Sequence, residues 1–141
     1  DLIWFDNLRS YGTPNYYVQQ LYSLNKGTDV VPVTLNNETV TGQDGCFASA
    51  VLDKKTHEVI IKIINTASRA QSSGFKINGV KGLSQAVNIT TLQSNNLDAV
   101  NSLDQPKSVS PKVWQSTLKN NTVNLELKPY SFNVIKVKMA G

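Results

Sequence analysis

One thiol and one imidazole are present in this sequence, Cys46 and His57, and a nucleophilic cysteine would need the two side by side. Cys46 begins an apolar run, whereas His57 ends the polar segment Asp53–His57, which is predicted to be a turn between two strands. The sequence therefore favours a small buried thiol over a catalytic one. A single cysteine also excludes an internal disulfide and any cysteine-rich zinc site.

The acidic residues do not follow the pattern of a metal site or an acid–base pair. Asp98 and Asp104 fall in one polar segment, but two carboxylates without further acidic neighbours make a poor calcium site. The three glutamates lie apart, in a polar loop, at the start of a predicted strand and on a predicted solvent face: Glu38, Glu58 and Glu126. We therefore predict no catalytic residue, no metal and no cofactor in this chain.

Three other side chains are candidates for binding. Asp6 and Asn7 follow a short apolar strand, and they either contact a substrate or cap the bend before Pro14. We favour the cap, because Asp and Asn do this in many turns. Trp114 is the one aromatic residue after Gly27 that could present a ring face to a sugar. The interpretation we favour for Trp114 is a plug that closes one end of a β domain.

Length and charge exclude several classes of protein. The 141 residues are enough for one domain with its own core. The net charge of +4 comes from scattered lysines, with Arg9 and Arg69 as the only arginines. A nucleic-acid interface would have clustered arginines with interleaved aromatic residues, so we predict a solvated surface and no nucleic-acid partner. No run of about twenty apolar residues is present, so no membrane span is predicted.

The first 27 residues differ from the rest, because they hold six of the eleven aromatic residues. Leu2–Phe5 is predicted to be a short strand. Thr13 can cap a helix, Pro14 fits its first turn, and Gly27 suits the left-handed position that follows a helix. Apolar residues recur at helical spacing between these signals: Tyr17, Val18, Leu21, Tyr22 and Leu24. The sequence therefore predicts an amphipathic helix over residues 14–24.

After Gly27, short alternating runs are separated by Gly, Asn, Asp and Ser, which is typical of a sandwich or barrel. We predict strands over residues 29–35, 47–52, 58–65, 74–77, 86–92, 113–118, 123–127 and 132–137. The strand over 58–65 is apolar on both faces, so it should be central. Gln93–Gln105 is polar and irregular, so a long surface loop is predicted. The predicted fold is mainly β, an antiparallel β-sandwich preceded by one amphipathic helix, with jelly-roll topology left open.

Two smaller features complete this prediction. Asn120-Asn121 is predicted to be the tight turn between the strands over 113–118 and 123–127. The phenylalanines that fall in predicted strands are expected in the core: Phe47, Phe75 and Phe132.

Two runs of residues near the start of the chain resemble a known family. Trp4-Phe5-Asp6-Asn7, followed by Tyr11-Gly12-Thr13-Pro14-Asn15-Tyr16-Tyr17-Val18-Gln19, resembles the segment that joins the catalytic barrel to the C-terminal domain in α-L-arabinofuranosidases of glycoside hydrolase family 51. The specific resemblance covers roughly the first thirty-five residues. The ending Leu127-Lys128-Pro129-Tyr130-Ser131-Phe132 resembles the family more weakly, since many glycosidase sandwiches end similarly.

The resemblance implies a (β/α)8 barrel with two catalytic glutamates, followed by an antiparallel β-sandwich. Residues 1–27 would be the end of the barrel, its last strand and helix, or a linker, and residues 28–141 the C-terminal domain. A barrel needs about 250 residues, so the chain would be a piece of the enzyme. No glutamate of this sequence lies in the Asn-Glu-Pro-like setting of the family's acid/base, so the catalytic glutamates cannot be assigned to any position here.

The resemblance also implies a parent enzyme that removes terminal arabinofuranosyl groups from arabinan or arabinoxylan with retention, in a periplasmic or extracellular location. For this chain it implies a non-catalytic role, with the catalytic barrel of the same polypeptide as partner, and Asp6 and Asn7 as substrate contacts only in the whole enzyme. The alternative function is a carbohydrate-binding module that acts by itself on plant polysaccharide through Trp114.

The helix over 14–24 carries one further expectation. Its apolar stripe would be exposed in the separate chain, and contiguous apolar surface usually finds a partner. We therefore expect the helix to dock on the sandwich or to form a homodimer with a second copy.

Overall fold

The structure, a computed structural model, describes residues 1–140 of the chain. It begins with a hairpin of β1 (Ile3–Phe5) and β2 (Ser10–Gly12), which pair antiparallel, and continues into α1 (Pro14–Leu24). The Thr13 hydroxyl accepts a hydrogen bond from the Tyr16 backbone N–H at 3.2 Å, which caps the helix. Both bounds of the predicted helix and its cap are confirmed.

The strands of the β portion follow the predicted runs closely. They are β3 (Asp29–Val31), β4 (Thr34–Leu35), β5 (Glu38–Thr39), β6 (Cys46–Asp53), β7 (Glu58–Asn65), β8 (Gln71–Lys76), β9 (Ala86–Gln93), β10 (Lys112–Thr117), β11 (Thr122–Leu127) and β12 (Ser131–Lys138), with a short 3-10 helix η1 (Gln43–Gly45) before β6. The first predicted strand is divided at Pro32 into β3 and β4, because proline cannot donate to a ladder. The long loop is present as residues 94–111.

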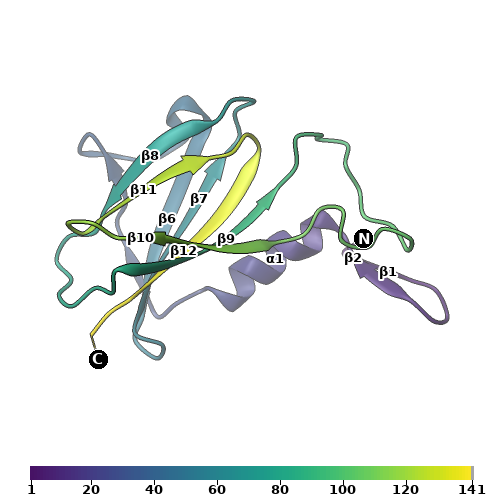
Figure 1. The fold of residues 1–141 in the computed structure, drawn as a ribbon, viewed down its shortest axis with the longest axis horizontal. Helices are drawn as coiled ribbons and strands as arrows, with labels where there is room; N and C mark the ends of the chain where they lie inside the picture. Colours follow the sequence, from purple (N-terminus) through teal and green to yellow (C-terminus); the bar gives the residue numbers. More distant parts are fainter. Residues whose placement is uncertain (141) are drawn as a thin grey trace.

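The strands form an antiparallel β-sandwich, as predicted. One sheet has six strands in the order β10-β9-β12-β7-β6-β3, and the second consists of β11 and β8. Figure 1 shows β8 and β11 lying over one face of the large sheet. β7 and β12 occupy the centre of the large sheet, which confirms the prediction for residues 58–65.

The turn at Asn120-Asn121 joins two sheets and not two neighbouring strands. Both residues have positive φ, 50° and 56°, as tight turns require. The strands on either side do not pair with each other, since β10 pairs with β9 and β11 pairs with β8. The sequence predicted the turn correctly but contained no signal for the change of sheet.

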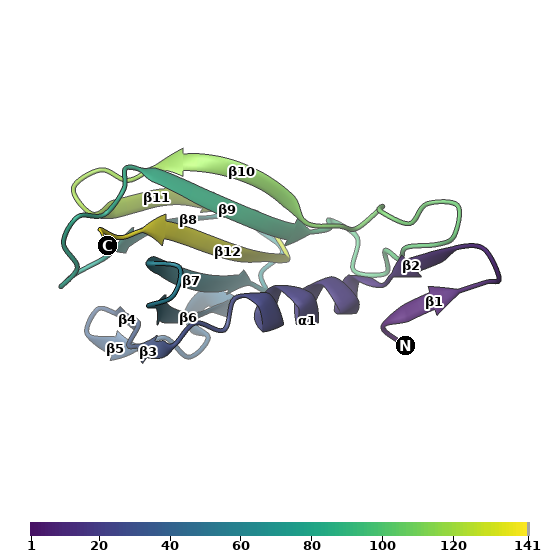
Figure 2. The same ribbon diagram turned by 90° about the horizontal axis from the view of Figure 1, so that it is seen from below.

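Apolar side chains lie on both faces of the large sheet. On the inner face, residues of β7, β9 and β12 pack against the alternate residues of β11: Val123, Leu125 and Leu127. On the outer face, Ile60 of β7 and Val134 of β12 pack with Leu21 of α1. Figure 2 shows α1 running along this outer face. The helix is therefore the third layer of the fold.

One of the three phenylalanines expected in the core is outside it. Phe132 is buried and Phe75 packs against the core, as predicted. Phe47 is 46% exposed, and its ring lies directly over Gly42, where any side chain would collide with it. The prediction for Phe47 was wrong because the ring covers a turn outside the core.

A buried lysine ties the end of α1 to the sheet. Lys62 of β7 donates a hydrogen bond from Nζ to the Asn25 carbonyl, at the negative end of the helix. Its Nζ also lies 5.6 Å from the centre of the Tyr22 ring, which stacks on Phe132 at 4.9 Å. The expected docking of the helix is therefore seen, while a homodimer through this helix stays a prediction.

A single buried amide joins the two sheets. Asn65, at the end of β7, donates from Nδ2 to the carbonyls of Arg69, Leu127 and Lys128, at 2.9, 3.3 and 3.0 Å. Its Oδ1 accepts from the Ala67 backbone N–H at 3.0 Å and from Gln71 Nε2 at 2.9 Å. Asn65 therefore links the large sheet to both strands of the small one.

The substitution Asn65→Ala should destabilise the chain by about 2–4 kcal/mol, because it leaves several buried carbonyls and N–H groups without partners. Urea unfolding followed by circular dichroism measures the loss. Asn124→Ala on the exposed face of β11 is the matched control and should change the midpoint little. Equal effects of the two substitutions would contradict the linking role of Asn65.

The stability should depend on pH through Lys62. Burial lowers the pKa of Lys62 from its ordinary value of 10.5. Between the lowered value and 10.5 the unfolded chain binds more protons than the folded chain, so folding becomes more favourable as the pH rises through this window. The free energy of unfolding of the wild type, measured against that of Lys62→Met, should therefore increase as the pH is raised from neutral toward 10.5, the ordinary pKa of lysine. A difference that stays constant over this range would contradict the lowered pKa.

Candidate functional site

Asp6 lies at the tip of the β1–β2 hairpin and bonds within its turn. Its Oδ1 accepts hydrogen bonds from the backbone N–H groups of Leu8 and Arg9, at 2.8 and 2.7 Å. Its Oδ2 lies 3.1 Å from the Arg9 guanidinium. These backbone bonds and the guanidinium hold the pKa of Asp6 below its ordinary value, so the carboxylate is charged and accepts these bonds at neutral pH.

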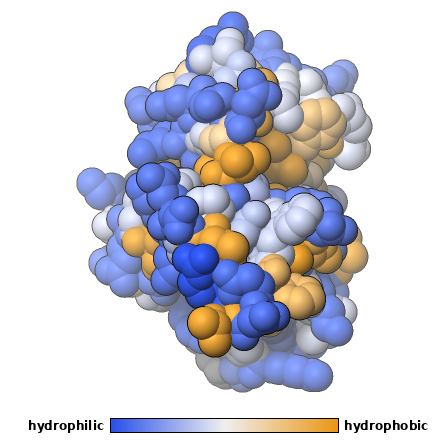
Figure 3. Space-filling model, turned by 90° about the vertical axis from the view of Figure 1, so that its right-hand side faces the viewer, coloured by the Kyte–Doolittle hydropathy of each residue, from blue (hydrophilic) through white to orange (hydrophobic). Residues whose placement is uncertain are grey.

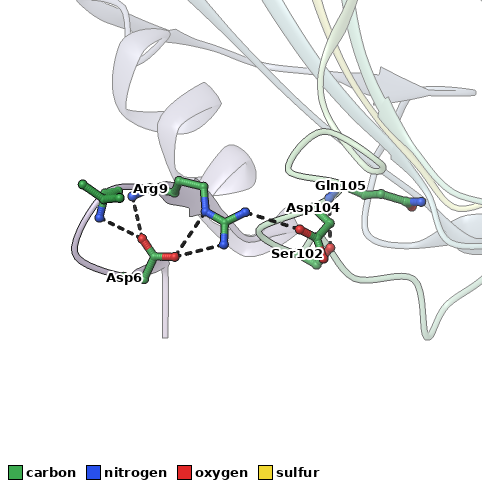
Figure 4. A network of polar contacts seen from close by, with 6 residues as sticks. Asp6, Arg9, Ser102, Asp104 and Gln105 are labelled. Carbon is green, nitrogen blue, oxygen red and sulfur yellow. Dashed lines mark hydrogen bonds and ion pairs between the residues drawn. The ribbon is translucent and has the colours of Figure 1, made fainter.

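The hairpin and the long loop are joined by two polar contacts. Arg9 also reaches Asp104 of the loop, with 3.3 Å between guanidinium nitrogen and carboxylate oxygen (Figure 4). Asn101, which is buried, donates from Nδ2 to the Gly12 carbonyl at 2.9 Å and to the Val109 carbonyl at 2.8 Å, and its Oδ1 accepts from the Val109 N–H at 2.7 Å. The loop is therefore fastened to the hairpin at the tip and at the base.

The hairpin and the adjoining loop expose large apolar side chains. Phe5 is 79% exposed and Leu8 94% exposed, and the other members of this set are Ile3, Trp4, Leu97 and Val100. Figure 3 views the molecule from this end and shows apolar side chains exposed among hydrophilic ones. Asn7 is exposed on the same turn. We call this set of residues, Ile3 to Phe5, Leu8, Leu97 and Val100, the apolar end.

A cleft of about 500 Å3 opens behind the apolar end. It lies between the first turns of α1, the long loop and the ends of the central strands, and its apolar lining includes Val18, Leu92, Leu97, Val109 and Phe132. A cleft of this size and character accepts an apolar side chain or a short apolar segment.

Trp114 lies on the edge strand β10, and its indole N–H donates to the Thr91 hydroxyl at 2.9 Å. The side chain is 39% exposed and lines a separate groove between the large sheet and β11. The tryptophan therefore borders an open groove, and the expectation that it plugs one end of the sandwich was wrong.

The remaining candidates do not come together. Cys46 pairs with Asn65 at one end of the β6–β7 hairpin, whereas His57 lies in the turn at the other end. Burial, together with the nearby charge of Asp44, raises the pKa of the Cys46 thiol, which is the opposite of activation. Within residues 1–140, no three His, Cys, Asp or Glu side chains gather as a metal site would require, and no helix is long and apolar enough to cross a membrane.

Among the glutamates, Glu58 has the clearest electrostatic setting. Burial acts to raise its pKa, but hydrogen bonds from Thr56 and Lys138 lower the pKa below the ordinary value. Lys138 Nζ lies 3.1 Å from its carboxylate. A general acid in glycoside hydrolysis needs a raised pKa, so Glu58 does not fit that role. Glu38 and Glu126 belong to β5 and β11, on different sheets.

Sequence reasoning missed Arg9 and Asn101, the two residues that hold the hairpin against the loop. Arg9 could have been found as one of only two arginines, since it follows the predicted bend by two positions. Asn101 gives no signal, because it is one of many asparagines in polar segments.

Comparison with known proteins gives one family. Residues 1–131 match the model of the α-L-arabinofuranosidase C-terminal domain. The chain is 27% identical over 138 residues to α-L-arabinofuranosidase 1 of Arabidopsis thaliana, covering 94% of this chain and 20% of that protein.

Solved structures agree with this match. The arabinose-bound MgGH51 α-L-arabinofuranosidase superimposes with a TM-score of 0.83 at 25% identity, over 99% of this chain and 21% of that one. The α-L-arabinofuranosidase of Thermotoga maritima, in its arabinose complex, has the same fold with a TM-score of 0.76 at 17% identity, over 97% of this chain and 31% of that one.

The chain thus spans about a fifth of the length of the curated relative it matches. The family model, however, covers most of its residues, from the hairpin to the first residue of β12. This chain therefore belongs to the family of α-L-arabinofuranosidase C-terminal domains, which confirms the resemblance to glycoside hydrolase family 51 carried by its first residues.

Proposed function

We propose that this chain is the non-catalytic C-terminal β-sandwich of an α-L-arabinofuranosidase, with residues 1–27 as the end of the catalytic barrel and residues 28–141 as the sandwich. The parent enzyme would remove terminal arabinofuranosyl groups from arabinan or arabinoxylan with retention. The partner of the chain is then the barrel of the same polypeptide, and the role of the sandwich is to support it.

The apolar end is the observation that supports this proposal. Phe5 and Leu8 lie almost fully in solvent on a hairpin that has no core of its own. Two strands of three residues are not stable alone in water, so the hairpin needs further strands or a packed surface to cover it. A barrel whose strands pair with β1 and whose helices pack on these side chains would supply the further strands and the packed surface.

The non-catalytic role is supported by the settings of the carboxylates. Retaining hydrolysis needs two carboxyl groups roughly 5 Å apart, one of them with a raised pKa. In this chain the carboxylates of Asp6, Asp29 and Glu58 are bonded to cationic side chains. Their role is therefore to pair with neighbouring cations within the fold.

Asp6 and Asn7 remain the proposed contacts to substrate in the whole enzyme. In a barrel they would follow the carboxyl end of a strand, where barrel active sites are built. Asp6 already accepts three hydrogen bonds within its own turn. Asn7 is exposed, so its side-chain amide is the better placed of the two to bond to a sugar.

Incubation of the 141-residue chain with an aryl α-L-arabinofuranoside should give no turnover. The intact enzyme is the positive control, and the released phenol is followed by absorbance. Turnover that persists through purification and scales with the amount of chain would overturn the non-catalytic assignment.

A stability experiment on the intact parent enzyme tests the apolar end. Phe5→Asp should lower the midpoint of thermal unfolding, because it places a charge in the apolar contact between the hairpin and the rest of the barrel. Val30→Asp is the matched control, since Val30 is similarly exposed, 88% against 79% for Phe5, but lies on the edge strand β3. Differential scanning calorimetry compares the two variants. Equal loss of stability in both variants would show that the apolar end is not the contact surface.

A further inference from the structure

The groove beside Trp114 is a second site, separate from the apolar end. Its volume is about 640 Å3, and it lies between the inner face of β9, β10 and β12 and the edge strand β11. Six strands of the large sheet face only two of the small one, so the inner face of the sheet is open at its β10 edge.

The inner face of the large sheet changes from apolar to polar as it approaches this groove. In one row across the sheet, Ile63 of β7 is followed by Asn133 of β12, Thr91 of β9 and Lys112 of β10. In the next row the outermost residue is Trp114, after three isoleucines: Ile61, Ile135 and Ile89. The part that β11 and β8 cover is apolar, and the open part carries hydrogen-bonding groups and one indole ring.

A chain of hydrogen bonds fixes the indole ring. The Trp114 N–H donates to the Thr91 hydroxyl, which donates to Asn133 Oδ1 at 2.8 Å. Asn133, which is buried, donates from Nδ2 to the Ser131 hydroxyl at 3.0 Å, and that hydroxyl donates to the Lys128 carbonyl at 2.7 Å. The ring is therefore held in one orientation, and the residue as a whole is 39% exposed.

Polar side chains surround the ring on both walls of the groove. Lys112 and Ser116 lie in line with Trp114 on β10, and Asn124, Glu126 and Lys128 line the opposite wall. These groups include donors, acceptors and both signs of charge, so the groove suits a neutral ligand with many hydroxyl groups and an apolar ring face.

We propose that this groove binds a neutral oligosaccharide, about two or three sugar units long, with one sugar ring stacked on Trp114 and its hydroxyls bonded to Lys112, Glu126 and Asn124. The site depends only on the sandwich. The choice of arabinan and arabinoxylan as probes rests on the proposed function, so failure of binding here would leave the supporting role of the domain unaffected.

The competing occupant is a β-strand from elsewhere in the parent polypeptide, added to the free edge of β11. The inward side chains of such a strand would pack against Lys112, Thr91 and Ser116, which are polar. Strands that complete a sandwich place apolar residues on an apolar inner face. The polar inner face therefore favours the sugar.

The test uses the two tryptophans of the chain. In the variant Trp4→Phe the only indole is Trp114, so its emission should shift when arabinan, arabinoxylan or xylan is titrated, and dextran serves as the unrelated glycan. In Trp114→Phe, where Trp4 is the remaining indole, no shift is expected. Absence of any shift in Trp4→Phe with all three probes would overturn the proposal.

Substitutions locate the binding. Trp114→Ala should weaken binding about tenfold, the loss expected when one stacked ring is removed. Thr91→Val keeps the shape of the side chain but frees the indole, and it should weaken binding by several-fold. Lys112 is exposed at the start of the edge strand β10, so Lys112→Ala should fold and tests the groove even if Trp114→Ala does not fold. Unchanged affinity in Lys112→Ala and Thr91→Val would contradict the site.

The intact enzyme distinguishes the sugar from the added strand. Affinity electrophoresis in arabinoxylan gels should show weaker retention for intact Trp114→Ala than for intact wild type. Equal retention of the two, together with binding by the isolated chain, would mean that another strand fills the groove in the whole protein, and the proposal would be wrong.

Discussion

The large sheet is apolar on both faces at its centre, and the rest of the structure follows from the need to cover both. Ile61 and Ile63 of β7 face the small sheet, while Ile60 faces α1. A sheet with one wet face would need no helix. Here the helix is a required layer, and Lys62 and the Tyr22 ring hold its end in place.

This constraint fixes the position of everything before the helix. Because Tyr17, Val18 and Leu21 of α1 pack against the sheet, the hairpin at the start of the helix is carried at a defined place beside the long loop, as Figure 2 shows. Arg9 and Asn101 then fasten the hairpin to that loop. The apolar end is thus presented by a rigid support, which suits a fixed contact with a large partner better than transient binding of a small one.

The sequence predicted the elements far better than the contacts between them. The bounds of α1 could be predicted because a capping threonine, a proline and a stripe at helical spacing all agree, and β7 because its apolar residues occupy both faces. The assignment of β10 and β11 to different sheets could not be predicted, since strand pairing is decided by residues distant in the chain. Asn65 and Asn133 were missed for a related reason: a buried amide and a surface amide look alike in a sequence rich in asparagine.

The two tryptophans, Trp4 and Trp114, lie on surfaces of different chemical character. Trp4 pairs with Tyr11 on a hairpin whose other exposed side chains are apolar, and its N–H donates to no group within residues 1–140. Trp114 donates its N–H to the half-buried Thr91 hydroxyl, which bonds in turn to the buried Asn133, and it borders charged and amide side chains. The surroundings of Trp4 suit an apolar contact with a protein, whereas the polar side chains that line the groove beside Trp114 suit a ligand rich in hydroxyls. The apolar end and the groove therefore differ in the chemistry of the partner that we propose for each.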